Sequence, residues 1–226
     1  MQDELISVER QEVIKLSPST LNLYLECPRC LWLSWHRKIK RPSGIFPSLP
    51  GGMDLVLKEY FDHYRGGDSL PPIVADKLPG KLMNPLPKTL MYKDSQRRAI
   101  LIGKLDDALE IGEGLHSVMD HKTRGFPPKD GILFPYQLQM DVYDFLMQES
   151  GFPTDHRAYL VYYYPTPGQL HNDFPFVVEV KDVLANPTRA KQVFEDTVKM
   201  LRDKMPAASD RCIYCNWAEQ INNLEV

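Results

Sequence analysis

The chain has 226 residues, of which 43% are hydrophobic, and this is enough to bury the core of a single soluble domain. Its formal net charge is −3, so it lacks the overall positive charge of many nucleic-acid-binding proteins, and any basic contact surface must be local. The sequence contains no run of about twenty apolar residues that could span a membrane, and its charged residues 1–13 lack the apolar region of a signal peptide, so we expect a cytoplasmic protein.

The N-terminal part of the chain brings cysteine, aromatic and basic residues together. Cys27 and Cys30 form a C-x-x-C pair, and Trp32 and Trp35 precede a basic cluster in residues 36–41. A basic cluster beside aromatic side chains suits contact with phosphates and stacking on single-stranded bases. A solvated helix end with core tryptophans explains the same residues, and for Trp32 we favour that interpretation.

A helix over residues 55–64 and a β-hairpin follow. Residues 98–111 are rich in apolar and β-branched side chains, which predicts a strand. Residues 112–114 (Gly-Glu-Gly) indicate a turn, and residues 115–122 predict the returning strand.

The predicted hairpin carries charged side chains at regular positions. Successive side chains of a strand point to opposite faces, so Asp120 and Lys122 lie on one face and His121 on the other. Asp106 on the first strand can then lie close to Asp120, whereas Asp107 points to the opposite face. Two neighbouring carboxylates repel each other unless a cation lies between them, and a hard divalent ion, Mg²⁺ or Mn²⁺, is the natural occupant.

A helix is predicted to follow the hairpin. Pro135 suits its first turn and Gly151 its end. Gln139 and Tyr143 are four residues apart and are therefore neighbours on one side of the helix. The pair could hydrogen-bond the carboxylate site, although Tyr143 also belongs to an apolar stripe that suits the core.

The C-terminal half completes an α/β pattern. Residues 157–164 and 174–180 predict two further strands, and residues 187–204 predict a helix. The alternation of helices and strands predicts an α/β fold with a mixed central sheet flanked by helices.

All the cysteines of the chain lie in two C-x-x-C pairs near its opposite ends, Cys27 with Cys30 and Cys212 with Cys215. Two such pairs without a further cysteine predict a four-cysteine metal site, and zinc fits the spacing by its chemistry. The alternatives are free structural thiols and a redox-active dithiol. A metal site would join the two ends of the chain and hold the intervening core closed.

In their order along the chain, these motifs resemble the PD-(D/E)XK nuclease superfamily, and within it the RecB-like branch that includes the CRISPR-associated iron–sulfur exonucleases. The family's Gly-x-x-Asp, Asp/Glu-x-Lys and Gln-x-x-x-Tyr motifs match residues 103–106, 120–122 and 139–143. Residues 17–33 resemble the branch's N-terminal helix followed by Cys-Pro, and residues 212–215 resemble its final cysteine motif. The likeness therefore extends over nearly the whole chain.

The resemblance implies a restriction-endonuclease-like core and a set of catalytic residues. The set is Asp106, Asp120, Lys122, Gln139 and Tyr143. The two aspartates would hold Mg²⁺ or Mn²⁺, the lysine would orient water or neutralise developing charge, and the last two residues would support the site.

Two departures from the branch pattern concern metal ligands. The branch usually has a histidine before the first acid, and the comparable position here is Asp54, a further candidate metal ligand, with Lys58 and Glu59 as alternatives. The branch binds a [4Fe–4S] cluster with one N-terminal and three C-terminal cysteines, whereas this chain has two and two. The resemblance therefore implies a [4Fe–4S] cluster, while the cysteine spacing leaves Zn²⁺ as the alternative.

We therefore predict a single nuclease domain over residues 1–226, with a catalytic core in residues 98–180 and a tail, residues 205–226, that completes the cysteine site. The expected activity is that of a metal-dependent DNA nuclease, an exonuclease of DNA repair, recombination or CRISPR adaptation. Its DNA would be single-stranded or have free ends, and a helicase or CRISPR integrase complex is the expected protein partner. The alternatives are an inactive nuclease-fold module that binds DNA or acts as a scaffold, and a redox protein.

Overall fold

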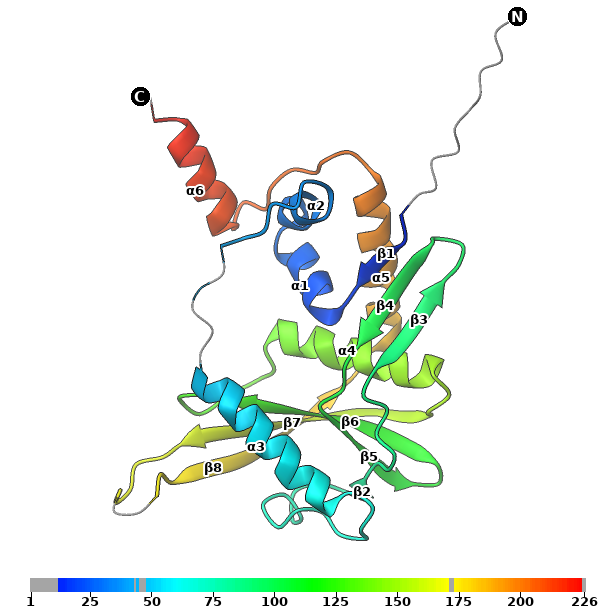
Figure 1. The fold of residues 1–226 in the computed structure, drawn as a ribbon, viewed down its shortest axis with the longest axis vertical. Coiled ribbons are helices and arrows are strands. Elements are labelled where there is room, and N and C mark those ends of the chain that lie inside the picture. Colours follow the sequence, from blue (N-terminus) through cyan, green and yellow to red (C-terminus); the bar gives the residue numbers. More distant parts are fainter. Residues whose placement is uncertain (1–11, 43, 45–47, 171–172, 225–226) are drawn as a thin grey trace, which may run out of the picture.

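The structure is a computed structural model that describes residues 12–42, 44, 48–170 and 173–224. Residues 1–11, part of the segment in which we predict no signal peptide, lie outside the described residues. The strands in the described residues are β1 (Ile14–Leu16), β2 (Lys81–Leu82), β3 (Leu90–Asp94), β4 (Ala99–Gly103), β5 (Asp107–Gly112), β6 (Leu115–Thr123), β7 (Thr154–Pro165) and β8 (Phe176–Leu184). The helices there are α1 (Pro18–Glu26), α2 (Pro28–His36), α3 (Ser48–Tyr64), α4 (Phe134–Glu149), α5 (Pro187–Arg202) and α6 (Ile213–Asn222), and none of them is long and apolar enough to cross a membrane (Figure 1).

A sheet with mixed strand directions lies at the centre of the fold. Its strand order is β2-β5-β6-β7-β8, in which β6 and β7 are parallel and the other neighbours are antiparallel. The parallel pair needs a crossover connection, which α4 supplies. Helix α3 packs on one face of this sheet and α4 on the other, with α5 against α4 (Figure 1). The predicted α/β fold with a mixed sheet flanked by helices is confirmed.

Strand β7 is buried on both faces of the sheet. Ala158, Leu160 and Tyr162 lie in the core on the α4 side, whereas Val161 and Tyr163 lie in the core on the α3 side. A strand covered on both faces needs a nearly continuous apolar sequence, and β7 has one.

The single strand predicted over residues 98–111 is wrong. β4 ends at Gly103 and pairs with β1 and β3 in a separate three-stranded sheet, while β5 pairs with β2 and β6. Residues 104–106 cross from one sheet to the other, so Asp106 lies in this connection and not on a strand. A Cβ atom at Gly103 would lie 2.6 Å from Leu146 Cδ1, which explains why the close approach of β4 to α4 requires glycine.

The first two helices meet at Cys27, which ends α1 and begins α2. Pro28 lacks a backbone N–H and restricts the preceding residue, so the helix stops and Cys27 adopts an extended φ of −161°. The C-terminal segment returns to this corner: Arg29 donates to the Pro206 carbonyl oxygen over 3.1 Å and pairs with Glu219 of α6 over 3.3 Å. The C-terminal segment therefore lies beside α2, and α6 follows it there (Figure 1).

Candidate functional site

A chain of polar contacts joins the D-x-K residues of β6 to the helix that follows them. The Gln139 amide nitrogen donates to Asp120 Oδ1 over 2.9 Å and to the Tyr143 hydroxyl over 3.1 Å. The Gln139 amide oxygen accepts from Lys122 Nζ over 2.9 Å, and Lys122 also forms an ion pair with Asp120. The structure thus brings together four of the predicted site residues, on the face of β6 that α4 covers.

Burial shapes the ionisation of this group. Burial raises the pKa of the Asp120 carboxyl to about 7, the Lys122 ammonium opposes the rise, and the neighbouring Asp106 adds to it. Burial also raises the pKa of Tyr143, so its hydroxyl keeps its proton at neutral pH. The Lys122 ammonium lies 4.8 Å from the centre of the Tyr136 ring, a further contact that positions it. A fully buried carboxylate beside a second one requires positive charge, which Lys122 provides here.

Lys58 links the connection between β4 and β5 to helix α3. Its Nζ lies 2.7 Å from Asp54 Oδ2 and 3.5 Å from Asp106 Oδ1. Asp54 is therefore close to Asp106, with Lys58 between them, while Glu59 is exposed. Three residues are candidates for the position of the branch's histidine. Lys58 contacts Asp106 directly and Asp54 is linked to it through Lys58, whereas Glu59 is exposed.

Asp107 has a different environment from its neighbour Asp106. It is buried in a bidentate ion pair with Arg65, with N–O distances of 3.0 and 3.1 Å. Burial raises the pKa of the Asp107 carboxyl, and the Arg65 guanidinium opposes this rise. Asp107 thus ties β5 to the end of α3, away from Asp120.

His121 lies on the opposite face of β6 from Asp120 and Lys122, as the alternation of the strand requires. Its Nδ1 is 3.0 Å from the Tyr163 hydroxyl and its ring packs 4.5 Å from that of Phe61. Burial lowers the pKa of His121 to about 4, so the imidazole is neutral at pH 7. It is a core residue between the sheet and α3.

The four cysteines form a second candidate site between the corner of α1 and α2 and the start of α6. Their sulfur atoms all lie within 4.8 Å of one another, and this is the group of metal-ligand side chains that stands out among the described residues. Sγ–Sγ distances are 3.5 Å for Cys30–Cys212, 3.7 Å for Cys30–Cys215 and 3.9 Å for Cys27–Cys215. The prediction that these residues cluster at metal-binding distance is confirmed.

Arg41 supports the cysteine cluster from the basic segment that the sequence singled out. Its guanidinium donates to Cys212 Sγ over 3.7 Å, lies 4.8 Å from the Tyr214 ring and pairs with Glu26. Burial raises the pKa of the Cys212 thiol, but hydrogen bonds from the Cys215 backbone N–H and from the neighbouring thiols outweigh it and lower the pKa to about 6. A thiolate is the form that binds metal, and Arg41 offsets part of its charge.

Several other side chains of the basic and aromatic segment contact the protein itself. Trp32 stacks on His36 with ring centres 4.4 Å apart and donates from Nε1 to the Asp203 carbonyl oxygen over 3.0 Å. Lys38 donates to the Trp35 carbonyl oxygen and lies over its ring. Trp32 is half-buried against the C-terminal segment, so it has a structural contact but lies outside the core that we expected for it, whereas Trp35 packs against the core.

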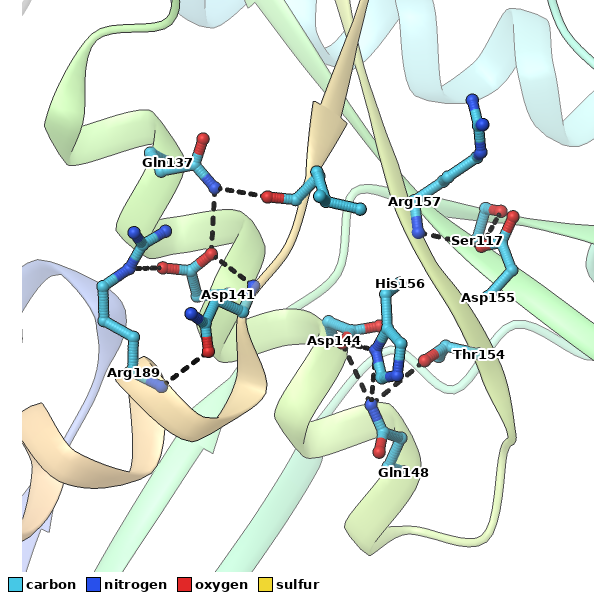
Figure 2. Close-up of polar contacts among 12 residues, drawn as sticks. Ser117, Gln137, Asp141, Asp144, Gln148, Thr154, Asp155, His156, Arg157 and Arg189 are labelled. Carbon is cyan, nitrogen blue, oxygen red and sulfur yellow. Dashed lines mark hydrogen bonds and ion pairs between the residues drawn. The ribbon is translucent and has the colours of Figure 1, made fainter.

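Two buried carboxylates of α4, Asp141 and Asp144, were not anticipated from the sequence (Figure 2). Asp141 accepts from Arg189 Nε of α5 over 2.6 Å and from Gln137 over 2.9 Å. Asp144 Oδ2 is 2.8 Å from Nδ1 of His156 in β7. These pairs hold α4 against α5 and β7. Because the charged partners Arg189 and His156 come from other elements, no local pattern could have indicated them.

Comparisons with known proteins agree with this fold. A family model described as "PD-(D/E)XK nuclease superfamily" matches residues 55–220. A search of curated proteins finds no match. The solved structure titled "Crystal structure of SSO0001" is similar over 86% of this chain and 80% of that chain, with a TM-score of 0.50 and 16% sequence identity, which shows likeness of fold alone.

Proposed function

Because the chain belongs to the PD-(D/E)XK nuclease superfamily, we propose that it is a Mg²⁺- or Mn²⁺-dependent deoxyribonuclease that hydrolyses phosphodiester bonds. The observation that carries this proposal is the contact network of Asp120, Lys122, Gln139 and Tyr143, with Asp106 beside it. An acid–lysine pair held by a glutamine amide offers a cation site, a proton donor and a fixed geometry in one place.

The donor set fits a hard divalent cation. Asp120 and Asp106 offer carboxylate oxygens close together, and Asp54 can add a third through the shared contact with Lys58. When bound there, the ion supplies a water of lowered pKa and positive charge for the phosphate oxygens. The raised pKa of Asp120 supports this assignment, because a buried carboxyl of that kind is stabilised in its charged form by a cation.

The protein side chains have separate roles in donating hydrogen bonds and in positioning the site. Lys122 is held by Asp120 and Gln139 and can donate an N–H to the attacking water or to a phosphate oxygen. Gln139 fixes the orientation of both Lys122 and Asp120, since its amide oxygen accepts from one and its nitrogen donates to the other. Tyr143 holds Gln139 in turn and remains a neutral hydroxyl.

The finer assignment rests on the sequence resemblance. We assign the chain to the RecB-like branch and propose exonuclease action on DNA that is single-stranded or has free ends, in DNA repair, recombination or CRISPR adaptation. A helicase or CRISPR integrase complex is the partner that this assignment implies. We further propose that residues 1–226 act as one nuclease domain of a cytoplasmic protein.

For the cysteine site, the sulfur spacing supports a single ion. A tetrahedral zinc ion with Zn–S distances of about 2.3 Å holds its sulfur ligands about 3.8 Å apart. The Sγ–Sγ distances of 3.5, 3.7 and 3.9 Å agree with this spacing. A [4Fe–4S] cluster, which the resemblance favours, places iron and sulfide between the thiolates and so separates them further. Metal analysis decides: zinc in a colourless sample supports a single ion, and a brown sample with iron and sulfide supports the cluster.

The nuclease activity is tested with end-labelled single- and double-stranded DNA in Mg²⁺, Mn²⁺ and EDTA. We expect hydrolysis with either metal, none in EDTA, and its loss in Asp120→Ala and Lys122→Ala at unchanged circular dichroism. Equal activity in the wild type and both variants would refute the assignment of these residues.

The contact of Lys58 with Asp54 and Asp106 favours one alternative, an inactive nuclease-fold module that binds DNA. Under this hypothesis, Lys58 permanently neutralises Asp54 and Asp106, the carboxylates that would otherwise hold the ion. DNA binding without hydrolysis under any metal would establish this alternative. A protein that neither binds nor cuts DNA would exclude both functions.

A further inference from the structure

An open cavity of about 510 Å³ lies beside the Gln139 and Tyr143 side of the candidate site. Its walls come from the end of β1, the start of α1, the end of β4 and helix α4, which lie close together in Figure 1. The lining residues are Lys15, Leu16, Ser17, Pro18, Ser19, Asn22, Ile102, Lys104, Gln139 and Tyr143. Its volume falls in the range of about 300–1,000 Å³ that is typical of ligand sites.

The lining of this cavity is positively charged. Its charged side chains are Lys15 and Lys104, and no carboxylate lines it. Both lysines are exposed, and within the described part of the chain neither forms an ion pair or a side-chain hydrogen bond. In a chain with a net charge of −3, two unpaired cations around one cavity favour an anionic ligand.

A second cavity, of about 400 Å³, lies on the other side of Lys104. Its lining includes Lys104, Leu105 and Asp106 of the connection between the two sheets, together with Lys58 and Lys88. Lys104 therefore lines both cavities. Gln139 lines one cavity and Asp106 lines the other, so the two cavities flank the candidate site.

We propose that the larger cavity binds the DNA backbone next to the phosphodiester that is hydrolysed, with Lys15 and Lys104 as its phosphate contacts. This inference rests on the proposed nuclease function and names a binding site within it. A DNA strand that lies in the larger cavity and continues past Lys104 enters the second cavity, which Asp106 lines. The apolar side chains of Ile102 and Pro18 offer contact to the sugars between the phosphates.

The first test measures DNA binding of Lys15→Met, Lys104→Met and the double variant by fluorescence anisotropy in EDTA at several salt concentrations. Each loss of a phosphate contact is expected to lower the salt dependence, the slope of log K against log salt, by roughly 0.7 for single strands and 0.9 for duplex. The affinity at low salt should fall about two- to fivefold per lysine. Hydrolysis at subsaturating DNA should fall by the same factor.

Lys191→Met is the matched control. Lys191 is an exposed lysine of α5 that lines neither cavity, so its replacement removes the same charge from the whole protein. An equal effect of all three substitutions would show that only net charge matters and would overturn the proposal.

The second test locates the contact on the DNA. Oligonucleotides in which one phosphate at a time is replaced by a neutral methylphosphonate should bind the wild type more weakly at one or two positions beside the cleaved bond. In Lys104→Met, the penalty at one of these positions should disappear, because its partner is already missing. Unchanged penalties in both lysine variants, with normal hydrolysis by the wild type, would reject the cavity and leave the nuclease function intact. A wild type that neither binds nor cuts DNA would reject both.

Discussion

The cysteine cluster and the carboxylate site are both candidate metal sites, but they are built in opposite ways. The cysteine cluster joins residues up to 188 positions apart, uses one kind of ligand and places all four sulfur atoms within 4.8 Å. The carboxylate site draws Asp120, Lys122 and Gln139 from adjacent elements and neutralises its acids with lysines. The first arrangement joins the N-terminal helices to the C-terminal segment, and the second lies between neighbouring elements of the core.

This contrast predicts that the cysteine site determines the stability of the fold and that the carboxylate site determines hydrolysis. Loss of the cysteine site should destabilise the fold, because metal binding and folding are coupled in such sites. Loss of the carboxylate site should affect hydrolysis and leave the fold intact. Four substitutions distinguish these two roles.

Cys30→Ser should have the largest effect. Structural zinc in small domains contributes about 10–16 kcal/mol of apparent binding free energy, which is comparable with the whole unfolding free energy of an ordinary domain, about 5–15 kcal/mol. We expect the melting temperature to fall by roughly 10 °C or more. Thermal unfolding followed by circular dichroism measures this, with Asp120→Asn as the comparison that should keep its melting temperature and lose hydrolysis. A stable, active Cys30→Ser protein would show that the cluster is dispensable.

Gln139→Leu should lower activity by about 10- to 100-fold, the usual effect of losing a residue that orients metal ligands. It removes the contacts to Asp120, Lys122 and Tyr143 together. Gln148→Leu is the matched control, since Gln148 also lies on α4 and also donates to a buried carboxylate, that of Asp144. Steady-state kinetics with labelled DNA distinguish the two, and equal losses would mean that the effect comes from α4 packing.

Arg41→Met should weaken metal retention at the cysteine site by about tenfold, because the guanidinium no longer offsets thiolate charge. Competition with a chromophoric chelator measures the metal affinity. Arg37→Met removes a charge from the same basic segment, but Arg37 is exposed and makes no side-chain contact with the cysteines, so its affinity should be unchanged. If both variants bind metal as the wild type does, Arg41 has no such role.

Lys58→Met should have the smallest effect, an increase in Mn²⁺ affinity of roughly two- to fivefold, the range expected for a partly exposed ion pair. The lysine and the ion compete for Asp54 and Asp106, so the Mn²⁺ concentration for half-maximal activity should fall. Lys81→Met, which removes an ion pair with Glu110 elsewhere on the sheet, is the control. A loss of activity without a change in Mn²⁺ dependence would instead make Lys58, in place of Asp54, the counterpart of the branch's histidine.

Much of the local arrangement follows from the sequence. The period of a strand predicts that Asp120 and Lys122 share a face and that His121 opposes them, and the contacts of Gln139 and Tyr163 agree. The helix predicted from Pro135 begins one residue earlier, at Phe134, and two strands and a helix follow it as expected. The two C-x-x-C pairs predict a common site, and the sulfur atoms meet.

Other features depended on the tertiary structure. Local sequence pattern did not indicate three of these features. They are the break between β4 and β5 at residues 104–106, the placement of Lys58 between Asp54 and Asp106, and the lysines around the larger cavity. Periodicity determines which face of an element a side chain occupies, because it reflects backbone geometry within a few residues. It does not determine which strand pairs with which, or which helix covers the site, because those choices are made by contacts between residues far apart in the chain.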